Sequence, residues 1–363
     1  MRQKTSRKKS LATTSRLRNR TREPDSSRQL GLASKDAVRR GFNFLCSAIC
    51  EAQAFEEYGF DYLFSLLTSL NSRDTIIRRQ AQKVGHSLSV KWVAQHPSVP
   101  QDADADTIAE LVFGSLSVPH FGVTDSLKPS ILAVAADCSP TEYCWFDPAN
   151  EPPPNDVPEV CECGDCNDRG DTSCRRCGKT LAARSRYEAW LLAMIRSYLG
   201  ERYGVKLGAR YSDVLKWVPE MRPYPAPGDD ADFRWSICAI THIVYTLNDY
   251  NSYRLDRRWL PDEFEALRNS LDPMIEMDDP ETVGEILDSL KAFRMDNSDP
   301  LIQAGVRYLL SRQNADGSWG ELDEYAYDWH HVTLAAVNGL DEYLWRGANL
   351  CFPKVAPFLA HFH

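Results

Sequence analysis

The sequence predicts an all-α protein, and three observations support that prediction. Apolar residues recur at spacings of three and four through most of the chain, which is the period of an amphipathic helix. Helix start signals precede several of these segments, whereas we find no run of alternating residues typical of strands. Hydrophobic residues make up 43% of the 363 residues, so most of the chain can bury a core.

The N-terminal part, residues 31–137, is expected to form a helical region. Ser34 is a candidate N-cap, because apolar residues follow it at helical spacing. Ser72 is a second candidate N-cap for the same reason. Asp104 and the neighbouring aspartates precede the apolar run 108–116, and acidic side chains favour the N-terminus of a helix.

Residues 138–160 interrupt the helical pattern. The prolines between positions 152 and 158 exclude a helix, because proline lacks an N–H group and restricts the residue before it. We therefore expect an extended, proline-rich connector here and place a domain boundary in it.

Residues 182–363 are predicted to form antiparallel helical hairpins. Ser185 and Glu188 match a capping box, and an apolar helical face follows them. Asp279-Pro280 and Asp299-Pro300 each combine an N-cap with a proline that the first turn accepts. The segment 233–247 is almost entirely apolar, which predicts a helix buried on most sides.

Charge is distributed unevenly along the chain. Residues 1–30 contain ten Lys or Arg and two acids, whereas the whole chain carries a net charge of -9. The remainder is therefore strongly acidic and a poor surface for nucleic acid, so nucleic-acid contact is expected only through the basic tail. We interpret the tail as a disordered, solvated arm.

The sequence contains no apolar run long enough for a membrane span or a secretory signal. We therefore expect no membrane span and a cytoplasmic location; an organelle transit peptide is the alternative interpretation of the Arg- and Ser-rich tail. In a reducing compartment, closely spaced cysteines favour thiolates on a metal ion over disulfides.

Five cysteines fall within seventeen residues: Cys161, Cys163, Cys166, Cys174 and Cys177. Zinc takes four tetrahedral ligands, so two close pairs of thiolates can hold one ion in a closed, structural site. Cys174 and Cys177 form the second pair, and the first pair is ambiguous. Cys163 and Cys166 have the usual two-residue gap, whereas Cys161 and Cys163 place Gly164 directly after the pair.

Residues 161–181 resemble a zinc ribbon, in which a glycine follows each cysteine pair. Cys163-Gly164, Asn167, Cys177-Gly178 and Leu181 match that pattern. The resemblance implies zinc as the cofactor and a small zinc knuckle between two helical regions.

Residues 308–320 predict a stabilising clasp between helices. A helix is expected to end near Gln313, and Asp316-Gly317 favours a tight turn in which glycine takes a positive φ. The side chain of Trp319 would then fold back and fill the space between the helices with a large apolar ring that carries one polar group. Gln313 can bond backbone groups that a helix end leaves without partners.

This segment closely resembles the Q-x-x-x-D-G-x-W-G repeat of the terpenoid cyclase and protein prenyltransferase superfamily. The stretch from His331 through Thr333 to Gly339-Leu340 resembles the helix that follows that repeat. The resemblance covers roughly residues 230–350. It implies a partial α/α toroid, in which inner helices line a central cavity.

The candidate catalytic residues are His242, His330, His331, Asp230 and Asp232. The sequence around His242 is weakly similar to that around His331. The toroid resemblance therefore implies that both segments are inner helices whose N-terminal halves lie at the same end of the cavity. We expect these side chains to converge there. Imidazoles with carboxylates suit acid–base chemistry or a second metal ion.

Two functions follow from these patterns. The first is a zinc-containing enzyme that acts on a hydrophobic or isoprenoid-like substrate in a helical cavity. The second is a non-enzymatic, zinc-stabilised module that binds a protein or peptide partner. A cavity with His242, His331 and Asp232 converging on it favours the enzyme.

Overall fold

The computed structural model describes residues 24–50, 52–228, 231–321 and 326–359. Residues 1–23 lie outside this part, so the expected disorder of the tail stays a prediction there. Residues 24–30 differ from that expectation because they already belong to a helix, in which Leu30 packs against the core.

The described residues form α-helices, short 3₁₀ helices and isolated bridges but no strand, which confirms the all-α prediction. The long helices are α1 (Pro24–Ile49), α2 (Ala52–Ser69), α3 (Thr75–Gln95), α4 (Ala105–Ser117), α7 (Arg186–Tyr203), α10 (Ala231–Leu247), α11 (Pro261–Glu276), α12 (Pro280–Ala292), α13 (Pro300–Arg312) and α14 (Ala326–Leu340). Shorter helices are α5 (Lys128–Val134), α6 (Pro140–Cys144), α8 (Tyr211–Leu215), α9 (Val218–Met221), α15 (Ala356–Leu359), η1 (Val118–Phe121), η2 (Arg257–Trp259) and η3 (Pro353–Val355).

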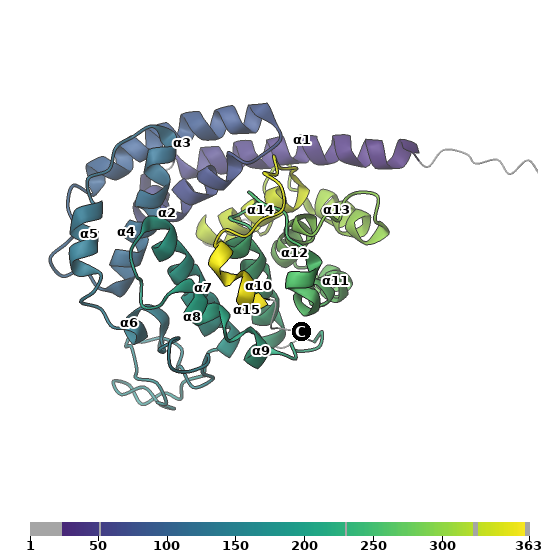
Figure 1. The fold of residues 1–363 in the computed structure, drawn as a ribbon. Helices are drawn as coiled ribbons and strands as arrows, with labels where there is room; N and C mark the ends of the chain where they lie inside the picture. Colours follow the sequence, from purple (N-terminus) through teal and green to yellow (C-terminus); the bar gives the residue numbers. More distant parts are fainter. Residues whose placement is uncertain (1–23, 51, 229–230, 322–325, 360–363) are drawn as a thin grey trace, which may run out of the picture.

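Six of the described long helices form a closed ring of contacts. Within the described residues, α2 contacts α4, α4 contacts α7, α7 contacts α10, α10 contacts α12, α12 contacts α14, and α14 contacts α2. The helices α1, α3, α11 and α13 pack around these ring helices (Figure 1). One cluster of buried apolar side chains includes residues of both the N-terminal and the C-terminal helices.

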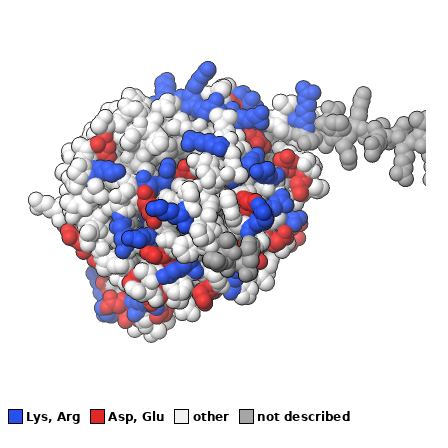
Figure 2. Space-filling view, viewed as in Figure 1, with Lys and Arg blue, Asp and Glu red and all other residues white. Residues whose placement is uncertain are grey.

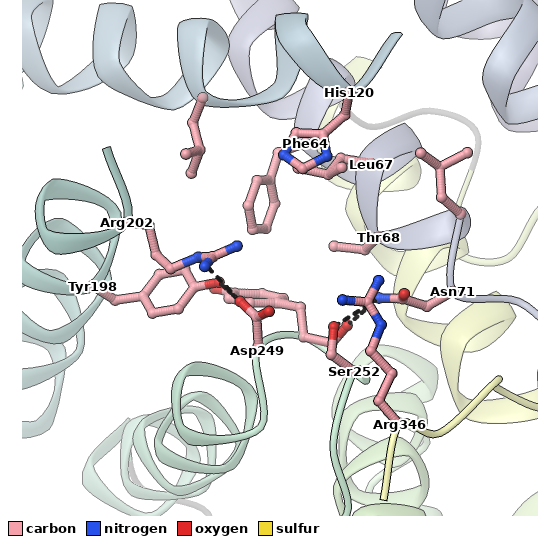
Figure 3. Close-up of a pocket in the computed structure, with 13 residues that line it drawn as sticks. Phe64, Leu67, Thr68, Asn71, His120, Tyr198, Arg202, Asp249, Ser252 and Arg346 are labelled. Atoms are coloured by element: carbon pink, nitrogen blue, oxygen red, sulfur yellow. Dashed lines mark hydrogen bonds and ion pairs between the residues drawn. The ribbon is translucent and has the colours of Figure 1, made fainter. Parts of the chain in front are cut away.

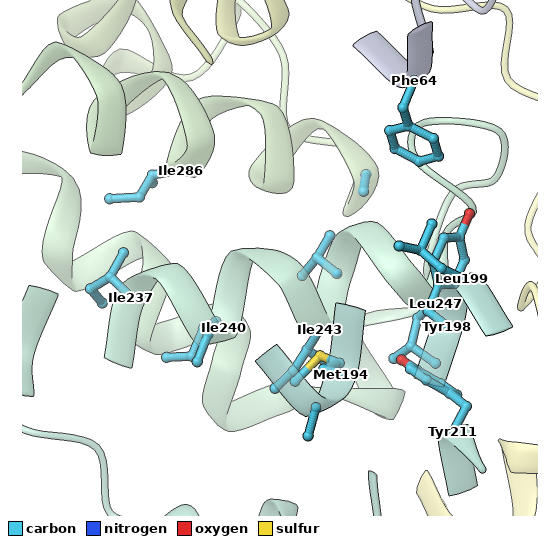
Figure 4. Packing of buried hydrophobic residues seen from close by; sticks show 14 of the residues in the cluster. Phe64, Met194, Tyr198, Leu199, Tyr211, Ile237, Ile240, Ile243, Leu247 and Ile286 are labelled. Carbon is cyan, nitrogen blue, oxygen red and sulfur yellow. The ribbon is translucent and has the colours of Figure 1, made fainter. Parts of the chain in front are cut away.

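Helix α10 illustrates why the ring holds together. Its isoleucines at 237, 240 and 243 are buried, and Figure 4 shows them between α7, which contributes Met194, and α12, which contributes Ile286. Apolar residues on more than one side of α10 let it contact two ring neighbours, as its nearly all-apolar sequence predicts.

Helices α12 and α14 pack in direct backbone contact. A Cβ added to Gly284 would lie 2.5 Å from the carbonyl of Ala335, and one added to Gly339 would lie 2.7 Å from the carbonyl oxygen of Gly284. The two helices run in the same direction, because Glu281 meets His331 near one end and Lys291 meets Asn338 near the other. Only glycine permits so close an approach. The close packing of the two helices brings the side chains of Glu281 and His331 into contact.

Local signals for helix starts are confirmed at α12 and α13 and wrong at α1 and α3. Asp279 accepts a hydrogen bond from the Thr282 N–H at 3.0 Å, and Asp299 accepts one from the Leu301 N–H at 2.9 Å. Ser34 lies inside α1 and donates to the Leu30 carbonyl, because the residues before it are also helical. The N-cap of α3 is Asp74 rather than Ser72.

The predicted clasp forms between α13, α14 and α1. Trp319 is fully buried and donates from Nε1 to the Leu309 carbonyl at 2.7 Å. Gln313 donates from Nε2 to the carbonyls of Ala37 and Gly317, each at 2.9 Å. Gly317 has a φ of 99°, the positive value that the turn requires.

The charged surface is mixed on the face in Figure 2, with Lys and Arg gathered along the edge that α1 and α3 form. Helix α3 contains no acidic residue between Thr75 and Gln95. None of the described helices combines the length and the apolar character needed to cross a bilayer.

Candidate functional site

Four of the five clustered cysteines bring their sulfurs together. The Sγ atoms of Cys161, Cys163, Cys174 and Cys177 all lie within 4.8 Å of one another. Cys161 is 3.4 Å from Cys177, and Cys163 is 3.6 Å from Cys174. Tetrahedral thiolate sites with metal–sulfur bonds of about 2.3 Å separate their sulfurs by about 3.8 Å. The geometry therefore suits one metal ion held by four thiolates.

The structure selects the first cysteine pair that the sequence left ambiguous. Cys161 and Cys163, one residue apart, belong to the cluster, whereas Cys166 is exposed and lies outside it. Gly164 and Gly178 have φ values of 80° and 73°, so each turns the chain after its cysteine pair. The one-residue gap is accommodated because the Gly164 N–H reaches back to the Cys161 carbonyl at 2.7 Å.

Backbone N–H groups support the thiolate form of Cys174. The N–H groups of Cys177 and Arg176 lower the pKa of the Cys174 thiol to about 6. Around the cluster, Arg169 bridges Glu151 at 2.8 Å and Asp156 at 2.5 Å. An isolated bridge between Pro158 and Ala183 closes the base of the segment.

A second candidate site lines a cavity at the centre of the helix ring. The cavity has a volume of about 150 Å³, and side chains from α2, α4, α7, α10, α12 and α14 surround it. Phe64, Phe113, Tyr245 and Tyr250 supply aromatic surface. His242, His331, Glu285 and Asp288 also line it, so ionisable groups share the cavity with this aromatic surface.

Two carboxylates and an imidazole converge beside this cavity. His331 Nδ1 lies 2.8 Å from Glu281 Oε1, and ligand atoms of Glu281, Glu285 and His331 all lie within 4.8 Å of one another. Glu281 and Glu285 are one turn apart on α12, so both side chains face α14. Glu285 is only 5% exposed and accepts a hydrogen bond from Thr241 Oγ1 at 2.8 Å.

Desolvation and neighbouring charges shift the pKa values of these groups strongly. Burial raises the pKa of Glu285 to about 8. Burial opposes the charge on His331, but the Glu281 carboxylate outweighs it and raises the pKa of His331 to about 10. Burial lowers the pKa of His242 to about 4, so this imidazole is neutral near pH 7. Its Nδ1 donates to the Cys238 carbonyl at 2.8 Å, which leaves the lone pair on Nε2.

The structure brings His242 and His331 to one cavity, whereas His330 and Asp232 do not line it. His330 is buried against Tyr62, with the ring centroids 4.3 Å apart, and does not line the cavity. Burial lowers the pKa of His330 to about 3. Asp232 is exposed in the first turn of α10, away from the cavity lining. Asp230 lies outside the described residues.

Sequence reasoning missed Glu281 as a functional candidate, and it missed Glu285 entirely. Glu281 lies in the first turn of α12, where an acidic side chain also favours the helix start. The available signal was Glu285 itself, an acid flanked by Val283, Ile286 and Leu287 on a helix whose apolar face should be buried.

Comparisons of the chain with protein-family models, with curated proteins and with solved structures find no match. The cysteine cluster and the carboxylate–imidazole cavity are therefore interpreted from their own geometry. The geometry shows that four cysteines could hold one metal ion and that the described part of the chain is all-helical.

Proposed function

We propose that the chain is an enzyme with a divalent metal ion at Glu281, Glu285 and His331, and that it acts on a hydrophobic substrate in the central cavity. The observation that carries this proposal is the convergence of these three side chains within 4.8 Å beside an aromatic cavity. We further propose that the four-cysteine cluster holds a structural zinc ion, since an all-thiolate site leaves no open position.

The donor set of the cavity site suits catalysis. Carboxylates and imidazole bind zinc and other first-row divalent ions, and three protein ligands leave positions open for substrate or water. Such an ion polarises a bound oxygen or lowers the pKa of bound water. His242 lies in the same cavity as a neutral imidazole, which can accept a proton at Nε2.

The cavity walls support a substrate with an apolar body and one polar group. A cavity of about 150 Å³ accepts a group about the size of benzene. Only the reacting end of a larger hydrophobic or isoprenoid-like molecule would therefore enter it. Asn251 is buried in the wall, and its Oδ1 atom has no hydrogen-bond partner among the described residues, so it offers an acceptor to the polar group of a ligand.

The contact ring supports an α/α toroid as the architecture. The helices α10, α12 and α14 lie in the region that resembles the terpenoid cyclase and protein prenyltransferase superfamily, and α2 and α4 supply ring helices from the N-terminal region. An inner ring with outer partners is the arrangement that the resemblance implies. Fold alone carries no chemistry, so the proposed activity depends on the cavity residues.

A protein- or peptide-binding module remains the second candidate function. The small volume of the cavity favours it, because pockets that enclose a whole ligand usually measure about 300–1,000 Å³. Extraction of the purified protein into organic solvent, followed by mass spectrometry, separates the two functions. The enzyme predicts a bound apolar small molecule, whereas the binding module predicts that only a protein or peptide co-purifies.

Metal analysis tests the cavity site directly. We expect two metal ions per chain, and Glu285→Gln or His331→Ala should each lower the content to one. Glu276→Gln is the matched control, because Glu276 is exposed at the end of α11 and should leave both ions bound. A wild-type content of one ion that the two cavity variants leave unchanged would refute the proposed metal site.

A further inference from the structure

A second cavity lies directly beside the first and gathers cationic side chains. We call it the arginine pocket and define it by Arg202, Arg346, His120, Tyr198 and Asp249. Its volume is about 130 Å³ (Figure 3). Phe64, Thr68 and Tyr250 line both this pocket and the central cavity, so the two are neighbours.

Asp249 holds Arg202 in a fixed orientation. Its Oδ1 atom lies 3.1 Å from Arg202 Nε, and the Tyr198 hydroxyl donates to the same oxygen at 2.9 Å. The Cys351 thiol approaches it at 3.5 Å. The ion pair engages Nε, the inner nitrogen of the guanidinium, and Figure 3 shows the group reaching into the pocket. Asp249 therefore acts as a positioning residue for Arg202.

Arg346 enters from another side of the pocket. Its backbone N–H donates to the Ser252 carbonyl at 2.8 Å, which ties this part of the chain to the loop after α10. In Figure 3 its guanidinium points between Thr68 and Asn71. Arg346 forms no ion pair with any residue in the described part of the chain. The pocket thus contains two guanidinium groups and one carboxylate.

The pKa of His120 reflects the positive potential of this pocket. Burial lowers the pKa of His120, and the guanidinium groups of Arg202 and Arg346 lower it further, while Asp249 acts in the opposite direction. The two guanidinium groups therefore face a small space with a single carboxylate to balance them. An anion bound between the arginines would relieve this excess.

We propose that the arginine pocket binds the oxyanion group of a small molecule, a phosphate or a carboxylate, between Arg202 and Arg346. Arginine suits this role because its planar fork donates two parallel hydrogen bonds to such groups. The identification of this oxyanion as one end of the substrate in the central cavity rests on the proposed function. The binding of the oxyanion itself does not.

Calorimetric titration of the full-length protein with inorganic phosphate, pyrophosphate and acetate tests the proposal. We expect saturable binding, and Arg202→Gln or Arg346→Gln should each weaken it at least tenfold. Preference for the phosphates over acetate assigns a phosphate ligand, and the reverse order assigns a carboxylate. Arg79→Gln, an exposed substitution on α3, is the control and should bind like the wild type.

The variant His331→Ala and the thermal midpoint of Arg346→Gln keep this test independent of metal binding and of folding. His331→Ala should retain phosphate affinity, which excludes binding to an ion in the cavity site. Arg346 is exposed, so Arg346→Gln should keep the thermal midpoint of the wild type even if Arg202→Gln does not. Absence of saturable binding to all three probes, or equal affinity in wild type and Arg346→Gln, would overturn the oxyanion site. Neither result affects the metal count that tests the proposed function.

Discussion

Replacing Cys174 with serine is expected to remove one metal ion from each chain and to unfold the segment 156–184. Cys174 is only 3% exposed, and its sulfur lies among those of Cys161, Cys163 and Cys177. The segment has few buried apolar side chains, so it lacks a core of its own. Structural zinc sites contribute on the order of 10 kcal/mol to folding, which exceeds any other stabilising interaction available to this segment.

Metal content and limited proteolysis measure this effect. New cleavage should appear between positions 156 and 184, while circular dichroism should retain nearly all of the helical signal, because the helices share a separate buried core. Cys166→Ser is the matched control, since Cys166 lies outside the sulfur cluster and is exposed. An undiminished metal content in Cys174→Ser, or equal loss in both variants, would contradict the four-cysteine site.

Truncating Trp319 to alanine is expected to cost about 3–5 kcal/mol of the free energy of unfolding. The side chain is fully buried, and its ring packs so closely on α1 that a Cβ added to Gly41 would lie 2.7 Å from it. Its backbone N–H also donates to Thr333 Oγ1 at 3.0 Å. The substitution would leave a cavity where α1, α13 and α14 meet, so the whole contact ring should lose stability.

Urea unfolding followed by circular dichroism measures this loss. Trp319→Phe separates packing from hydrogen bonding, because it keeps most of the apolar volume but removes the Nε1 donor to Leu309. We expect that variant to lose roughly 1–3 kcal/mol, the penalty for a buried carbonyl without its partner together with some lost packing. Equal stability of the alanine variant and the wild type would show that the clasp does not hold α1 against the C-terminal helices.

The sequence by itself determined the helical class, the starts of α12 and α13, and the clasp at Trp319. These features depend on neighbours within a few residues along the chain, such as Asp279 before Pro280 or Asp316 before Gly317. Spacing also identified the cysteine cluster, because two thiolate pairs must lie close in sequence to form a knuckle. The start of α1 was misplaced because Pro24 and Asp25, which favour a helix start, lie within the basic tail that we interpreted as disordered.

Only the tertiary structure decided which side chains meet. Cys161 rather than Cys166 joins the sulfur cluster, and Glu281 with Glu285 rather than Asp232 faces His331. These outcomes depend on how the backbone turns at Gly164 and on how closely α12 approaches α14 at Gly284 and Gly339. The spacing of residues on one helix fixes which face they share, but the partner on another helix is set by packing, which residues distant in the sequence determine together.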